Sequence, residues 1–109
     1  MTQHFDLETI DGISVVTFSG PKIAPEAQDA LHSLAGNGHT RVVLDFSNIH
    51  FLSSKSLATV FGLKKKLDAE GAQLRLCCLG PALLDMLHVT HMDGILDVSG
   101  TREEALQGF

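Results

Sequence analysis

The sequence has few cysteines, and the only two, Cys77 and Cys78, are adjacent. No C-x-x-C spacing occurs, so the usual zinc and dithiol redox motifs are absent. Both residues fall in an apolar run that reads as a strand, where successive side chains point to opposite faces of the sheet. We therefore expect two reduced thiols that do not easily bond each other, as in a protein of a reducing compartment.

Long apolar runs and an excess of basic residues are also missing. Eight Lys and Arg residues stand against thirteen Asp and Glu residues, a net charge of −5 with neutral histidines, which argues against nucleic acid or an anionic membrane as partner. No apolar run is long enough for a membrane span, and residues 1–12 show no signal-peptide pattern. We expect a cytoplasmic protein that binds other proteins, as a monomer or weak dimer.

Several motifs of enzymes and metal sites do not occur. The sequence contains no G-x-x-x-x-G-K-[ST], G-x-G-x-x-G or G-x-S-x-G pattern, which excludes the common nucleotide and nucleophile-elbow motifs. His88 and His91 have a ligand-like spacing but no third ligand in view, so we predict no metal and no cofactor. Ser54 as a catalytic nucleophile would need a base, for which His50 is the only nearby candidate. We expect a binding protein, not an enzyme.

The pattern that is present predicts one domain over residues 1–109, of which 44% are hydrophobic. Two short strands, residues 4–9 and 13–18, flank an Asp-Gly turn and read as an antiparallel hairpin. Further strands are expected at 41–46, 73–79 and 95–98. Helices are expected from residue 25, from 53 or 54, from 81, and over 101–107, where Thr101 and Glu104 are spaced as a capping box.

Strand, helix, strand, helix, strand over residues 41–98 requires parallel strands joined by crossovers. The fold class predicted is therefore α/β, a mixed sheet with an antiparallel N-terminal hairpin, a parallel βαβαβ unit and about four helices. The helix that starts near residue 54 is expected to bury Leu57, Val60, Phe61 and Leu67 and to expose Lys55, Thr59, Lys66 and Glu70.

Residues 53–56, Ser-Ser-Lys-Ser, stand at the start of that helix and are called the 53–56 segment below. One serine suffices to cap the first N–H groups, with a contribution of about 1 kcal/mol. The same helix N-terminus also favours an anion, and a phosphoserine brings about −1.5 to −2 charges and three acceptor oxygens. Both interpretations, a structural cap and a modification site, start from the same physics.

The chain resembles the STAS domains (sulfate transporter and anti-sigma-factor antagonist), in particular the small stand-alone antagonists. The resemblance lies in VVLDFSNIHFLSSKSLATVFGLKKKLDAEGAQLRL, residues 42–76, and LGPALLDMLHVTHMDGIL, residues 79–96. The first stretch is similar to the family's strand, "F-x-D-S-S-G-L" junction, helix and next strand; the second is similar to its following helix and "T-G-L-D" turn.

The resemblance implies that Ser54 is the phosphorylated serine, with Ser53 and Ser56 as secondary candidates. Ser53, Lys55 and Ser56 stand where the family has aspartate, serine and glycine. It further implies a surface that binds a serine kinase acting as anti-sigma factor, a phosphatase that reverses the modification, and release of a sigma factor for transcription. The partner-binding residues expected are Lys22, Asp45, Ser53, Ser54, Lys55 and Ser56.

Two alternatives remain open at this point. Asp45, late in its strand, either accepts hydrogen bonds from loop N–H groups or contacts a partner directly. The whole domain either antagonises an anti-sigma factor or serves as a scaffold module in a signalling or transport-associated complex that involves no sigma factor.

Overall fold

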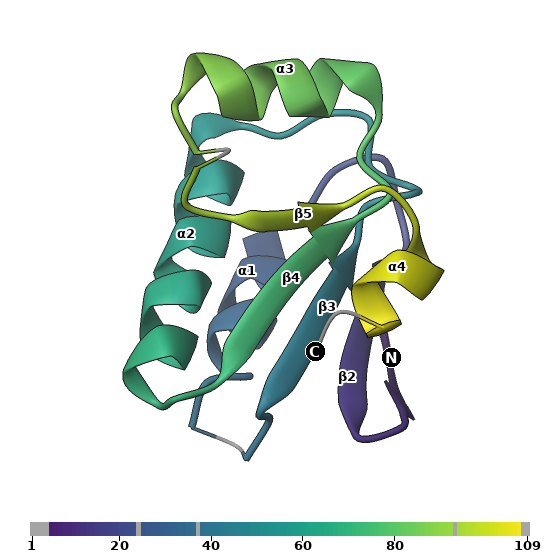
Figure 1. Cartoon of the computed structure of the whole chain (residues 1–109). Helices are drawn as coiled ribbons and strands as arrows, with labels where there is room; N and C mark the ends of the chain where they lie inside the picture. The colour runs from purple at the N-terminus through teal and green to yellow at the C-terminus, as the bar shows by residue number, and fades with distance from the viewer. Residues whose placement is uncertain (1–4, 24, 37, 93, 108–109) are drawn as a thin grey trace.

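The computed structural model describes residues 5–23, 25–36, 38–92 and 94–107, and its elements follow the predicted order (Figure 1). The strands are β1 (Phe5–Ile10), β2 (Ile13–Phe18), β3 (Arg41–Asp45), β4 (Gln73–Cys77) and β5 (Asp97–Ser99). The helices are α1 (Pro25–His32), α2 (Ser54–Ala69), α3 (Pro81–Val89) and α4 (Arg102–Gln107). The strands lie in the sheet in chain order; β1 and β2 are antiparallel, and every other neighbouring pair is parallel. The predicted fold class is confirmed.

The hairpin between β1 and β2 forms for a local reason. Asp11 and Gly12 both have positive φ angles, 51° and 79°, as a two-residue type I′ turn requires. Opposite residues then pair from Ile10 with Ile13 to Phe5 with Phe18. The Phe18 ring continues into the core, where it makes an edge-to-face contact with Phe46 at 5.3 Å between centroids.

The sheet has two unequal faces. Helices α1 and α2 cover one face and enclose the larger apolar cluster, which includes alternate residues of the central strands, such as Val42, Leu44 and Leu76. The other face carries a smaller cluster of Ile13, Val15, Val43 and Cys77, covered by Ala105 of the short helix α4. In Figure 1, α3 runs across the end of the sheet at which β3 and β4 finish. Leu83 and Leu87 join α3 to the larger cluster.

Several predicted boundaries are wrong by one or two residues, and the largest differences are in β4 and β5. The last strand is Asp97–Ser99 and not 95–98, and β4 ends at Cys77 and not at residue 79. Cys78 has a φ angle of 64°, a left-handed conformation that breaks the alternation of a strand. The expectation that the two thiols point to opposite faces is therefore wrong, since Cys78 Sγ lies 3.4 Å from Cys77 Sγ and donates a hydrogen bond to it.

Candidate functional site

The site begins at the N-terminus of α2, where Ser53 is the N-cap. Its φ and ψ angles, −75° and 164°, are extended, and its hydroxyl accepts the Ser56 N–H at 3.0 Å. This bond satisfies one of the N–H groups that a helix leaves unpaired at its start. The capping role expected for one serine of the 53–56 segment thus belongs to Ser53.

Ser56 faces inward and ties α2 to α1. Its side chain is buried, and its hydroxyl oxygen is 3.0 Å from Ser53 Oγ and 3.3 Å from Gln28 Nε2, both of which donate to it. Gln28 Oε1 in turn accepts a hydrogen bond from Thr59 Oγ1 at 3.3 Å. A hydroxyl held in this way does not face a partner, so we leave Ser56 out of the contact proposed below.

Thr59 was expected on the exposed side of α2, and this expectation is wrong. The side chain is buried and bonds to both Gln28 and the Lys55 carbonyl oxygen. A polar residue on a helix usually faces solvent, which is why the pattern predicts exposure. Here Gln28 of α1 supplies a buried acceptor for the Thr59 hydroxyl. No signal in the sequence pairs residues 28 and 59, which meet only through the packing of α1 against α2.

Ser54 and Lys55 are the members of the 53–56 segment that face solvent. Both are exposed, and no described residue forms a hydrogen bond with the Ser54 hydroxyl or an ion pair with Lys55. The Ser54 hydroxyl therefore stands at the positive end of a 16-residue helix without a structural task of its own.

The loop between β2 and α1, which contains Pro21 and Lys22, lies beside the start of α2. The Pro21 carbonyl oxygen accepts the N–H groups of His50 and Phe51 at 2.7 and 3.2 Å. Lys22, the next residue, is exposed. Phe51 is 58% exposed, an unusual position for a phenyl ring, and sequence reasoning missed it because its neighbour Leu52 is fully buried and both belong to one apolar run. The loop, Phe51 and the exposed part of the 53–56 segment border one another along the chain and through these hydrogen bonds.

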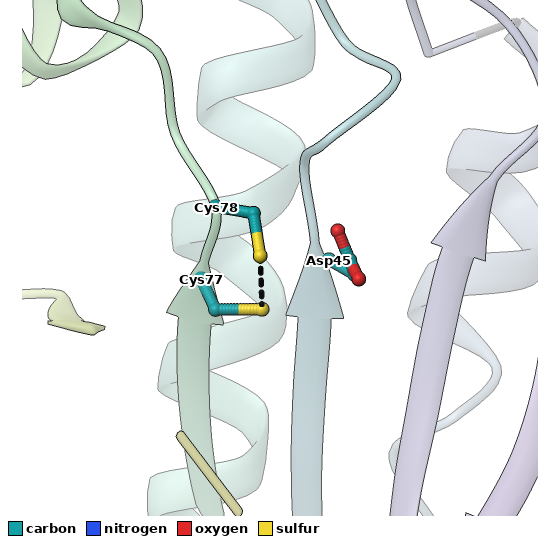
Figure 2. A group of neighbouring side chains, drawn as sticks. All are labelled: Asp45, Cys77 and Cys78. Carbon is teal, nitrogen blue, oxygen red and sulfur yellow. Dashed lines mark hydrogen bonds between the residues drawn. The ribbon is translucent and has the colours of Figure 1, made fainter. Parts of the chain in front are cut away.

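Asp45 lies on the face of the sheet opposite α2, where its side chain bonds to Arg102 of α4. Figure 2 shows it next to Cys77 and Cys78. Its Oδ1 accepts the Ser47 N–H at 2.8 Å, which confirms the predicted bond to a loop N–H, and its Oδ2 accepts Arg102 Nε at 2.9 Å. Burial alone would raise the pKa of Asp45; the hydrogen bonds from Ser47 and Arg102 outweigh burial and hold the pKa below its ordinary value.

Arg102 is a site residue that sequence reasoning missed. Besides Asp45, its guanidinium donates to Glu8 Oε1 at 2.9 Å and to Thr17 Oγ1 at 2.6 Å. Burial would lower the pKa of Arg102, but the carboxylates of Asp45 and Glu8 raise it. The arginine thereby joins α4 to three strands, through partners 57 to 94 positions away, a distance at which no motif connects them.

Within the described residues, one group has the makings of a metal or metalloid site: Asp45, Cys77 and Cys78, whose ligand atoms lie within 4.8 Å of one another. The two histidines first considered for that role, His88 and His91, are not part of such a group in the described part of the chain.

None of the helices in the described ranges is long and apolar enough to cross a bilayer.

Comparison with known proteins identifies similar chains. A family model for the STAS domain matches residues 4–105. The putative anti-sigma factor antagonist BtrV of Bordetella bronchiseptica is 28% identical over 106 residues, which cover 94% of this chain and 91% of that protein. The crystal structure of an anti-sigma factor antagonist from Mycobacterium paratuberculosis is also 28% identical, with a TM-score of 0.83, and the match covers 94% of this chain and 89% of that one.

A more distant likeness concerns the Bacillus cell fate determinant SpoIIAA in its phosphorylated form. That structure matches with a TM-score of 0.71 at 19% identity and covers 94% of this chain and 96% of its own. At this identity the likeness is one of fold.

Proposed function

This chain belongs to the STAS domain family, and from that premise we propose that it is an anti-sigma factor antagonist that acts by binding. Its partner is a serine kinase that acts as anti-sigma factor; the kinase phosphorylates Ser54, and a phosphatase reverses the reaction. Binding of the antagonist releases a sigma factor, and phosphorylation ends the binding. The names of the Bordetella and Mycobacterium relatives support this proposal.

The observation that carries the proposal is the division of labour at the start of α2. Ser53 caps the helix and Ser56 is buried in the tie to α1, whereas Ser54 is exposed and forms no hydrogen bond with a described residue. A phosphoryl group added to Ser54 therefore breaks no existing contact. The helix dipole stabilises the added charge, and Lys55 is the nearest cation in sequence.

The same charge acts against a docked partner. Phe51 offers an apolar anchor beside Ser54, and interface anchors of this kind carry a large part of binding energy. A dianion brought against a partner that offers no counter-charge of its own costs several kcal/mol, and about 4 kcal/mol weakens binding about a thousandfold. Lys22 of the neighbouring loop completes the proposed contact surface with Phe51, Ser53, Ser54 and Lys55. Asp45, which faces the opposite side of the sheet, serves the fold and not the contact.

The test compares three variants for binding to the kinase recovered from the native cell by pull-down. Ser54→Asp should lose affinity by at least about tenfold with an unchanged melting temperature, and Ser54→Ala should bind but accept no phosphate. Ser53→Asp is the matched control, because aspartate is an equally good N-cap; we expect it to retain more binding than Ser54→Asp.

Two results would contradict the proposal. Phosphate found on Ser53 or Ser56, with Ser54 unmodified, would show that another serine is the phosphorylation site. Equal binding by the wild type and Ser54→Asp would favour the scaffold alternative, in which the domain takes part in a complex without a sigma factor.

A further inference from the structure

The adjacent thiols Cys77 and Cys78 lie where β4 ends, and Figure 2 shows them side by side next to Asp45 of β3. Cys77 is fully buried under α4, and Cys78 is partly exposed. The positive φ angle of Cys78, 64°, turns its side chain back over its neighbour, so that the two sulfur atoms stand 3.4 Å apart. Two convergent sulfurs, one of them within reach of solvent, form a bidentate soft-ligand pair.

A disulfide is a poor product at this position. The described residues contain no cis peptide bond, so the two Cα atoms are about 3.8 Å apart, whereas disulfides prefer a separation of roughly 4.4 to 6.8 Å. Closing the bond would also draw the sulfurs together from 3.4 Å to about 2.05 Å. An atom that bonds to both sulfurs requires almost no movement. With bonds of about 2.3 Å to each sulfur and a sulfur–sulfur distance of 3.4 Å, the S–atom–S angle is about 95°.

The surroundings select the kind of atom. Cys77 is fully buried and Cys78 is partly exposed, and burial penalises the charged thiolates that zinc and similar ions require. Asp45, the only nearby carboxylate of the group, already accepts hydrogen bonds from Ser47 and Arg102 on its two oxygens. The position therefore offers two neutral sulfur ligands beside a carboxylate that is already paired with Arg102. Their angle at a bound atom is close to that of a pyramidal arsenic(III) centre and smaller than the tetrahedral angle of zinc.

We propose that Cys77 and Cys78 form a dithiol site that binds trivalent arsenicals. In the reaction, an arsenical with two hydroxyl groups exchanges both As–O bonds for As–S bonds. Each thiol proton leaves with a hydroxyl group, so that two waters are released and arsenic stays in the +3 state. Cys78, the accessible thiol, reacts first, and Cys77 closes the ring. This site lies on the sheet face opposite α2 and does not depend on the function proposed for Ser54.

The experiment treats the native full-length chain, kept reduced, with phenylarsine oxide and follows intact mass and free thiols. We expect one arsenical per chain, simultaneous loss of both thiols, and reversal by a dithiol such as 2,3-dimercaptopropanol but not by the same concentration of a monothiol. Cys78→Ser should weaken binding by about a hundredfold or more, since the second bond is then lost. Cys77→Ser should weaken binding in the same way. Because this substitution also alters the core, the Cys78→Ser variant is the decisive one.

Four results would overturn the proposal. If the wild type and Cys78→Ser bound the arsenical with equal affinity, the two thiols would not act as a pair. Binding of two arsenicals per chain would lead to the same conclusion. Adduct formation only in urea would show that the folded site is closed. Tight binding of Cd²⁺ that Asp45→Asn abolishes, with no arsenical adduct, would reassign the group as a three-ligand metal site.

Discussion

At the scale of single residues, the three serines of the 53–56 segment have three different tasks. Ser53 accepts a backbone N–H, Ser56 is buried between α2 and α1, and Ser54 is exposed. The hydrogen-bond partners of each hydroxyl, and not the residue type, decide which substitution affects stability and which affects binding.

Ser53→Ala should lower the free energy of unfolding by about 1 kcal/mol, the usual cost of a lost N-cap. Ser54→Ala should change it by less than about 0.5 kcal/mol, as surface substitutions do. Urea unfolding of both variants and the wild type measures the difference. Equal destabilisation by the two substitutions would show that the cap is not confined to Ser53.

Asp45 makes a prediction about pH. Its pKa in the folded chain is below the ordinary value of 3.8, so the unfolded chain binds more protons in that range, and stability is lost as pH falls below about 4. Above that range, the ionised Asp45 side chain makes its full contribution to the free energy of unfolding. Asp45→Asn should therefore be less stable than the wild type at pH 7, and the gap should narrow at pH 3. Thermal unfolding at the two pH values tests this; a gap of constant size would exclude Asp45 as the source.

At the scale of elements, a buried polar network joins α1 and α2. Gln28 donates to Ser56 and accepts from Thr59, and all three side chains are buried. Such a network aligns the two helices, because each group would be left unsatisfied if either helix rotated.

Thr59→Val keeps the shape of the side chain but removes the donor to Gln28. We expect a loss of about 1 to 3 kcal/mol, the cost of leaving a buried acceptor unpaired. The double variant Thr59→Val with Gln28→Leu should recover part of that loss, since both partners are then apolar. Chemical denaturation of the four proteins completes the cycle, and simple additivity of the two single effects would mean that the side chains are not coupled.

Helix α4 depends on Arg102 in the same way. The guanidinium bonds to Asp45, Glu8 and Thr17, and Ala105 behind it covers Cys77 and Val43. Arg102→Gln should expose this face, and we expect faster reaction of the Cys77 thiol with a thiol reagent. An unchanged rate would show that α4 stays in place without the ion pair.

At the scale of the whole molecule, the sheet separates two surfaces. Ser54 stands at the start of α2 on one face, and the thiol pair lies under α4 on the other. The larger cluster between the sheet and the helices α1 and α2 is closely packed, with most members under 5% exposed. We therefore expect an arsenical on the thiols to change the affinity for the kinase by less than about threefold. Titration of the kinase against modified and unmodified protein measures this, and a larger change would mean that the two surfaces are coupled.

Much of the fold could be predicted because it depends on local chemistry. The Asp11-Gly12 turn, the apolar run of β3 and the helix signals around residues 54 to 71 need only neighbouring residues to be recognised. The same is true of a serine cap at the start of α2, since capping is a contact across three positions, although the sequence left open which serine it is. The failures concern Thr59 and Cys78, where a distant partner or a single backbone angle overrides the local pattern.

The sequence by itself determined the order of the elements, the mixed sheet and the position of the serines at a helix start, because each follows from spacing within a few residues. Only the tertiary structure decided which serine is exposed, that Gln28 meets Thr59, that Arg102 holds Asp45, and that two adjacent thiols converge. The physical reason is that burial and long-range hydrogen bonds arise when elements far apart in the chain pack together, and no local pattern encodes those distances.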